Sequence, residues 1–286
     1  MTKPFALPVP PRPPKEPRVI ASLWIGQRLS FIEEIVMKSY LDAGHRFLLF
    51  GDERPAELMP GVEYFDYREV VEAPFAIGPG AYHNNGVFSD LFRLILIRDL
   101  GVTWVDMDAY CLRAFDFPAD QPLFATELSD DQVGNGVLYL PPSSPTLHEA
   151  IPYFYMDNPI PPFLPPEDRQ ALMARRDRGE RFGIERLKWA VSGPYLLSYL
   201  LIKNDEMRHA LPRAAFYGGM RSRRRPFSRL GVPLARIETE GAYSVHFYGR
   251  TRRFVRDENG GLPPEGSYLR LLCARHGIDP NRAPVV

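Results

Sequence analysis

The first 155 residues alternate short, continuously apolar runs with segments of helical periodicity, and this alternation restricts the fold more than any other feature of the chain. Runs with the length and composition of buried strands lie at 19–25, 45–52, 62–67, 102–108, 122–128 and 135–142. Helical segments separate several of them, at 29–44, 88–101 and 144–156, and we expect Ser89 to cap the second and Gly101 to end it. Strands joined by helices form parallel sheets. The sequence therefore predicts an α/β fold with a mostly parallel, Rossmann-like sheet flanked by helices.

Beyond residue 157 the pattern becomes helical, arginine-rich and less regular, and this predicts an irregular helical second half. Proline clusters mark the expected boundaries. We expect a Pro-rich leader over 1–17, one domain over 18–256 with a helical insertion at about 157–215, and a tail with a short helix over 257–286.

The composition excludes some classes of function. Acidic and basic residues balance at 35 each, so no net field attracts nucleic acid. The cysteines, Cys111 and Cys273, match no metal-ligand spacing and are expected to be reduced thiols. No apolar run has the ~18 residues of a membrane span, and the N-terminus lacks the apolar region of a secretory signal. We expect a cytoplasmic protein.

Three arginine-rich stretches, 175–181, 221–229 and 250–256, leave two interpretations open. They are solvated faces balanced by acids elsewhere, or they bind an anionic acceptor or membrane surface. The second interpretation would add peripheral association with the inner face of the membrane.

Two aspartates, Asp106 and Asp108, follow an apolar strand one residue apart. Alternate residues of a strand face one side, so both carboxylates can approach one point. Ligands of parallel sheets gather beyond the carboxyl ends of the strands, and carboxylate oxygens suit Mg²⁺ or Mn²⁺. The alternative is a polar strand end that turns into a loop.

The preceding segment carries Asp90 and Arg93 on one face of an otherwise apolar helix. On a surface they would be an ordinary ion pair. In a helix this apolar, we expect them to line a polar pocket.

Together these residues carry a resemblance. The stretch SDLFRLILIRDLGVTWVDMD (89–108) resembles the core motif of DXD-containing sugar transferases of glycosyltransferase family 32, which have the metal-dependent GT-A fold. LWIG (23–26) resembles the first strand of that family, and the similarity covers roughly residues 18–113. Two positions depart from the family pattern: Gly101-Val102 replaces a Gly-Gly turn, and Ala21-Ser22 replaces His-Gln before the tryptophan.

The resemblance implies a role for each matching residue. Trp24 would stack on the base of a nucleotide sugar, and Asp90 and Arg93 would hold the hydroxyls of the donor sugar. Asp106 would contact ribose or metal, and Asp108 would ligate the metal, which makes this pair the catalytic centre.

A later strand offers a third ligand. AYSVHFYG (242–249) resembles the closing segment of the family and places His246 as a metal ligand. The alternative is a hydrogen-bonded core histidine.

The acceptor side is less well marked. Glu127, Asp131 and Asn135, in a polar stretch between two strands, are acceptor-side candidates or solvated loop residues. Trp189 and Gly193-Pro194 resemble a family element that could shape the acceptor pocket, although core packing explains the tryptophan equally well.

The implied function is a metal-dependent, retaining glycosyltransferase that uses Mn²⁺ or Mg²⁺. It would move a hexosyl group from a nucleoside-diphosphate sugar, with a UDP-sugar expected, to a hydroxyl of a glycan or lipid-linked glycan, as in surface polysaccharide synthesis. One alternative is a degenerate fold of this kind that acts as a nucleotide-sugar-binding scaffold. Another is a nucleotidyltransferase, although IGQRLSF (25–31) lacks the Gly-rich phosphate loop that such an enzyme needs.

Overall fold

A six-stranded sheet with the order β3-β2-β1-β4-β7-β6 forms the centre of the computed structural model, which describes residues 17–218, 227 and 229–286. Its strands are β1 (Ile20–Trp24), β2 (Phe47–Gly51), β3 (Val62–Asp66), β4 (Thr103–Val105), β6 (Leu123–Ser129) and β7 (Gln132–Tyr139). The first four pair in parallel, β7 is antiparallel to β4, and β6 is antiparallel to β7. The predicted α/β class, with a mostly parallel sheet flanked by helices, is confirmed.

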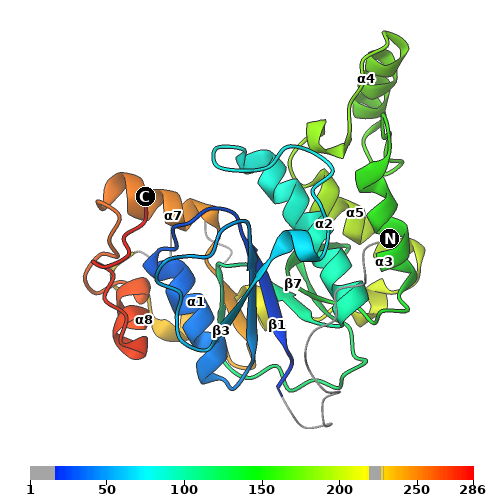
Figure 1. The fold of residues 1–286 in the computed structure, drawn as a ribbon. Helices are drawn as coiled ribbons and strands as arrows, with labels where there is room; N and C mark the ends of the chain where they lie inside the picture. The colour runs from blue at the N-terminus through cyan, green and yellow to red at the C-terminus, as the bar shows by residue number, and fades with distance from the viewer. Residues whose placement is uncertain (1–16, 219–226, 228) are drawn as a thin grey trace.

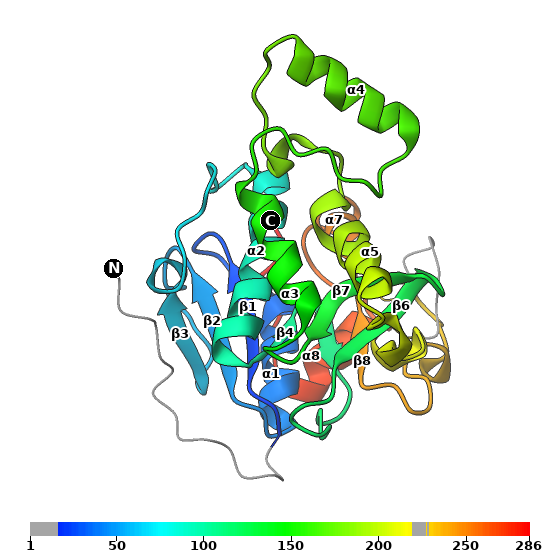
Figure 2. The same ribbon diagram turned by 90° about the vertical axis from the view of Figure 1, so that its right-hand side faces the viewer.

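Helices cover both faces of the sheet (Figure 1). On one side lie α1 (Phe31–Asp42) and α8 (Tyr268–His276), and on the other α2 (Tyr82–Leu100), α3 (Pro145–Ala150) and α5 (Leu196–Lys203). The remaining α-helices are α4 (Pro166–Asp177), α6 (Ala214–Tyr217) and α7 (Gly249–Glu258). Short 3₁₀ turns and one π-helical turn, η4 (Val191–Tyr195), join the helices of the second half. Figure 2 shows α4 projecting from the body of the protein.

The order of the strands reverses direction between β1 and β4, and this reversal indicates which edge of the sheet is suited to bind a ligand. From β1 the chain adds β2 and β3 on one side, and it then returns to place β4 on the other side of β1. In such sheets a crevice opens beyond the carboxyl ends of the two strands at the reversal. Trp24 ends β1 and Asp106 follows β4, so both residues lie at this edge.

Helix α2 begins earlier than the sequence pattern predicts. It starts at Tyr82, so Ser89 lies inside the helix and the prediction that it caps the N-terminus is wrong. The side chain of Asn85 bonds to both the N–H and the C=O of Gly78, at 2.9 Å each, and this anchors the extra turns to the preceding loop. The other end matches the prediction, because Gly101 adopts the left-handed conformation (φ 64°) that commonly terminates a helix.

The strand predicted over residues 102–108 is shorter than expected, because residues 106–108 form a turn. β4 ends at Val105, and a turn closed by the Ala109 N–H on the Asp106 carbonyl (2.9 Å) leads into β5 (Ala109–Cys111). β5 pairs antiparallel with β8 (Ser244–His246) in a separate two-stranded sheet. The Asp-x-Asp motif therefore lies in a turn, where the chain leaves the central sheet.

The polar stretch between β6 and β7 is a tight hairpin rather than a long loop. Glu127 lies on β6, Asn135 lies on β7, and only Asp130 and Asp131 connect the strands. The extended strands bring Asn135 back toward the centre of the sheet.

The remaining predictions concern the two ends of the chain and the arginine-rich stretches. Residues 1–16 and most of the 221–229 stretch lie outside the described part of the chain. The 250–256 stretch forms α7, which the sequence pattern did not predict, and α8 is the expected C-terminal helix. Of the helices in the described residues, none combines the length and hydropathy required to cross a bilayer.

Both cysteines are free and buried, and burial raises the pKa of each thiol to about 12. At pH 8 the thiolate fraction is then about 10⁻⁴, and the thiolate is the reactive form. We expect a thiol reagent at pH 8 to label Cys111 and Cys273 far more slowly in the native protein than in guanidinium. The labelling rate is measured from the absorbance of the released chromophore. Equal rates in the two conditions would contradict the buried positions.

Candidate metal centre and adjoining polar pocket

Two carboxylates and one imidazole converge beyond the carboxyl end of β4. His246 Nε2 lies 3.2 Å from Asp108 Oδ1 and 3.5 Å from Asp106 Oδ2. One ligand atom from each residue lies within 4.8 Å of the others. The predicted side chains therefore meet, although they come from a turn and from a strand more than 130 residues later.

The local fold explains this convergence. The antiparallel register of β5 and β8 places His246 opposite Ala109, directly after the turn that carries both aspartates. Asp106 is fixed at two points: its N–H donates to Gly136 C=O (2.7 Å), and its Oδ1 accepts from Trp104 Nε1 (2.8 Å).

Gly136 on β7 provides the space for this cluster. A Cβ at this position would lie 2.6 Å from His246 Nε2 and 3.1 Å from Asp106 Oδ2. A strand glycine often marks a close approach of other groups, and here the groups are the candidate ligands themselves.

The cluster strongly perturbs the protonation of its members. Burial alone would raise the pKa of Asp106, but Arg93 and His246 hold it at about 2. Burial raises the pKa of Asp108 despite the nearby imidazole. Burial would lower the pKa of His246, yet Asp108 and Asp106 raise it to about 9. The two carboxylates therefore favour a positive charge at this point, whether on the His246 imidazole or on a bound cation.

The donor set fits a divalent cation. Carboxylate oxygens suit Mg²⁺ and Mn²⁺, and an imidazole is readily accepted by Mn²⁺. His246 Nε2 is the ring nitrogen that faces the carboxylates. The other nitrogen, Nδ1, has no hydrogen-bond partner among the described residues.

Arg93 connects the cluster to a neighbouring pocket. Its guanidinium is buried, lies 3.3 Å from Asp106 Oδ1 and 3.2 Å from Asp90 Oδ1, and also donates to the carbonyl of Asn135. The Trp104 ring lies beneath it, 4.8 Å from Cζ to the ring centroid. The predicted Asp90–Arg93 pair is therefore buried, and Arg93 bridges the carboxylates of Asp90 and Asp106.

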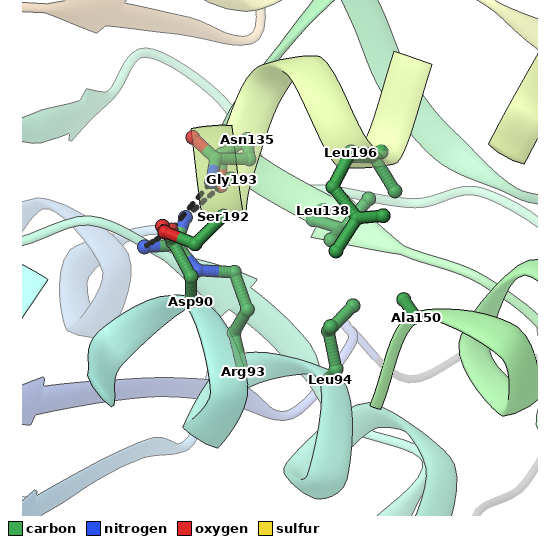
Figure 3. Close-up of a pocket in the computed structure, with 10 residues that line it drawn as sticks. Asp90, Arg93, Leu94, Asn135, Leu138, Ala150, Ser192, Gly193 and Leu196 are labelled. Carbon is green, nitrogen blue, oxygen red and sulfur yellow. Dashed lines mark hydrogen bonds and ion pairs between the residues drawn. The ribbon is translucent and has the colours of Figure 1, made fainter. Parts of the chain in front are cut away.

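Asp90 forms the polar wall of the pocket (Figure 3). It accepts hydrogen bonds from Asn135 Nδ2 (2.8 Å) and Ser192 Oγ (2.7 Å), and burial raises its pKa. Gly193 lies directly against these groups, because a Cβ there would be 2.5 Å from Asn135 Nδ2 and 2.7 Å from Asp90 Oδ2. Apolar side chains form the opposite wall: Leu94, Leu138, Ala150, Leu196 and Leu197.

Trp24, at the end of β1, already has a neighbour. The Arg252 guanidinium of α7 lies over its ring, 5.2 Å from the centroid, and pairs with the buried carboxylate of Glu33. Burial raises the pKa of Asp108, and the positive charge of Arg252 is among the groups that oppose this rise.

A second polar group lies behind His246. The Tyr248 ring centroid is 4.5 Å from the His246 ring centroid, and burial together with the nearby Glu127 raises the pKa of Tyr248. Tyr248 adopts the left-handed conformation (φ 63°), which is rare for a bulky residue and often marks a functional site. Glu127 is close enough to His246 to contribute to the rise of its pKa, and its assignment to the acceptor side stays a prediction.

The other acceptor-side candidates lie in different places. Asn135 contacts Asp90 rather than open solvent. Asp131 lies at the exposed tip of the hairpin, where it accepts from Ser129 Oγ, about 13 Å along the strand from Asn135.

The sequence reasoning missed Ser192, Arg252 and Tyr248. No local pattern marks these three residues. The alternating glycines of V-G-N-G-V (133–137) could only have indicated that other groups pack closely against this strand.

Comparisons with known proteins add little beyond this geometry. No protein-family model matches the chain, and no curated protein matches it. A solved structure described as "PaToxG Glycosyltransferase" is similar with a TM-score of 0.43 and 15% sequence identity, over 68% of this chain and 74% of that chain.

We predict that Gly136→Ala removes the response to metal. The added Cβ would push His246 away from the carboxylates and destabilise the protein by about 1–3 kcal/mol through overpacking. The wild-type protein should gain about 2.7 kcal/mol from Mn²⁺ at 100-fold its Kd, measured by thermal unfolding.

Gly249→Ala is the matched control, because no atom lies within 4 Å of a Cβ at that position. It should retain the full Mn²⁺ response. A normal response from Gly136→Ala would show that a metal does not bind between these three side chains.

Proposed function

We propose that this protein is a divalent-metal-dependent glycosyltransferase of the GT-A type. It would transfer a hexosyl group, with retention of configuration, from a nucleoside-diphosphate sugar such as a UDP-sugar to a hydroxyl of a glycan or lipid-linked glycan. We place this reaction in surface polysaccharide synthesis, on the cytoplasmic side of the membrane, where nucleotide sugars are available.

One observation carries the proposal. Ligand atoms of Asp106, Asp108 and His246 lie within 4.8 Å of one another at the edge of the sheet where strand order reverses. This is the edge at which α/β sheets bind their ligands, and the Asp90–Arg93 pair lies directly beside it. The resemblance to family 32 motifs rests on these same aspartates and arginine.

Asp106, Asp108 and His246 would hold Mn²⁺ or Mg²⁺. A bound divalent ion stabilises the charge that develops on a departing nucleoside diphosphate. Arg252, which lies over the Trp24 ring, would add a second cation for the same phosphates.

The donor would lie across the crevice between β1 and β4. Trp24 would contact the base, which requires Arg252 to leave the face of the ring or to stack with the base. Asp90 would accept a hydrogen bond from a donor-sugar hydroxyl with its remaining acceptor capacity. Arg93 would keep Asp90 and Asp106 ionised and in position.

The acceptor would approach past Glu127. This carboxylate and Tyr248, whose ring centroid lies 4.5 Å from that of His246, would orient an incoming hydroxyl. Asn135 would act indirectly, by positioning Asp90.

The test is a panel of nucleotide sugars with Mn²⁺, scored for slow donor hydrolysis and for thermal stabilisation. Turnover of one or a few donors is expected. Donor binding without hydrolysis or transfer, under any divalent metal, would instead indicate a nucleotide-sugar-binding protein.

Asp108→Asn should reduce donor turnover at least 100-fold and abolish Mn²⁺-dependent stabilisation, because the amide is a poor ligand that brings no charge. Asp116→Asn, an exposed aspartate shortly after the motif, is the control and should behave as wild type. Normal turnover of Asp108→Asn would exclude the proposed metal role.

Asp90→Asn should reduce discrimination among nucleotide sugars by about tenfold or more, because a charged hydrogen bond to a sugar hydroxyl is lost. Affinity for the nucleoside diphosphate alone should change little. Asp99→Asn, at the exposed end of the same helix, is the control. An unchanged donor preference of Asp90→Asn, measured as kcat/KM ratios, would count against its contact with the sugar.

A further inference from the structure

Two aromatic side chains stand in solvent at the N-terminal end of α2. Trp189 is 70% exposed and Tyr82 is 81% exposed. The interpretation of Trp189 as a core residue is therefore wrong, in contrast to Trp104, which is 1% exposed. Large aliphatic residues that are exposed elsewhere in the described chain lie on other segments: Leu128, Ile202, Leu230, Leu234 and Leu271.

The Trp189 ring is seated rather than loose. A Cβ at Gly86 would lie 3.1 Å from its Cη2 and 3.2 Å from its Cζ3, so the indole edge rests on the bare backbone of α2. Glycine inside a helix is unfavourable relative to alanine, and this close contact gives a reason for it. The His83 ring lies 5.9 Å away. The indole is thus fixed against α2 while most of its surface faces solvent.

Trp189 is connected to the polar pocket at Asp90 in two ways. Gly86 lies one helical turn before Asp90 on the same face of α2. Three residues after Trp189, Ser192 donates to Asp90. Between them Ala190 adopts a left-handed conformation (φ 71°), which turns the chain from the exposed indole into the π-helical turn.

We infer that Trp189, with the His83 ring beside it, is a stacking platform for a pyranose ring. The inference rests on the proposed function and names the kind of ligand that lies next to Asp90. One face of a pyranose presents C–H groups that pack on an aromatic ring, while its hydroxyls point outward to polar partners. An exposed, seated aromatic ring beside a carboxylate pocket offers both kinds of contact.

Two sources could supply this ring: the donor sugar or a sugar unit of the acceptor. Intrinsic fluorescence can separate them, because the chain has three tryptophans and Trp189 is by far the most exposed. We would titrate wild type, Trp189→Ala and Tyr155→Ala with three probes. These are millimolar methyl hexopyranosides and oligosaccharides, UDP-sugars with Mn²⁺, and UDP with Mn²⁺.

Saccharide-induced fluorescence changes in wild type, lost in Trp189→Ala and retained in Tyr155→Ala, are the expected result. Tyr155 is the control because it is also exposed (53%) but ends the 3₁₀ helix η2 (Ile151–Tyr155) and lies near Arg98, in the last turn of α2. A response to free saccharides assigns the platform to the acceptor, with acceptor KM raised tenfold or more in Trp189→Ala. A response to UDP-sugars but not to UDP assigns it to the donor.

Two results would overturn the inference. One is that no saccharide or nucleotide sugar responds differently in wild type and Trp189→Ala. The other is that Trp189→Ala instead loses binding to anionic phospholipid vesicles, which would make the aromatic pair a membrane contact. Donor hydrolysis is measured separately, so saccharide binding at Trp189 without any turnover would retain the platform and reject the transferase.

Discussion

The buried guanidinium of Arg93 is the constraint on which the site depends. One cation bridges the carboxylates of Asp90 and Asp106, bonds to the backbone of β7, and rests on the Trp104 ring. Removing either partner of a buried ion pair leaves an uncompensated charge, so the loss of any one of these charged residues would destabilise the others in the interior. Through Arg93, helix α2, strand β4 and strand β7 share one electrostatic centre.

Close packing around this centre is achieved by omitting side chains. Gly136 and Gly193 each lie where a methyl group would collide with a functional atom, Nε2 of His246 in one case and the carboxylate of Asp90 in the other. The two glycines come from different elements, β7 and η4, so backbone from both sides closes the polar groups in. The geometry of the site is therefore set by backbone proximity as much as by side-chain choice.

Sequence reasoning predicted the regular parts well, because apolar periodicity reports directly on burial. Strand β1, helix α1 and the C-terminal cap at Gly101 follow from such local signals. It failed where a distant contact decides the structure. The turn at Asp106 and the strand at Ala109 exist because β8 pairs there, and nothing near residue 106 signals that partner. Ser192 and Arg252 were missed for the same reason, since their roles arise only from tertiary packing.

The pairing of β5 with β8 has a consequence for how the protein matures. The third candidate ligand comes from residue 246, after every strand of the main sheet has been synthesised. A nascent chain therefore carries an incomplete cluster, with two acidic groups and no imidazole, until its last quarter emerges and docks. The three candidate ligands are therefore brought together only when β8, the last strand of the described chain, docks against β5.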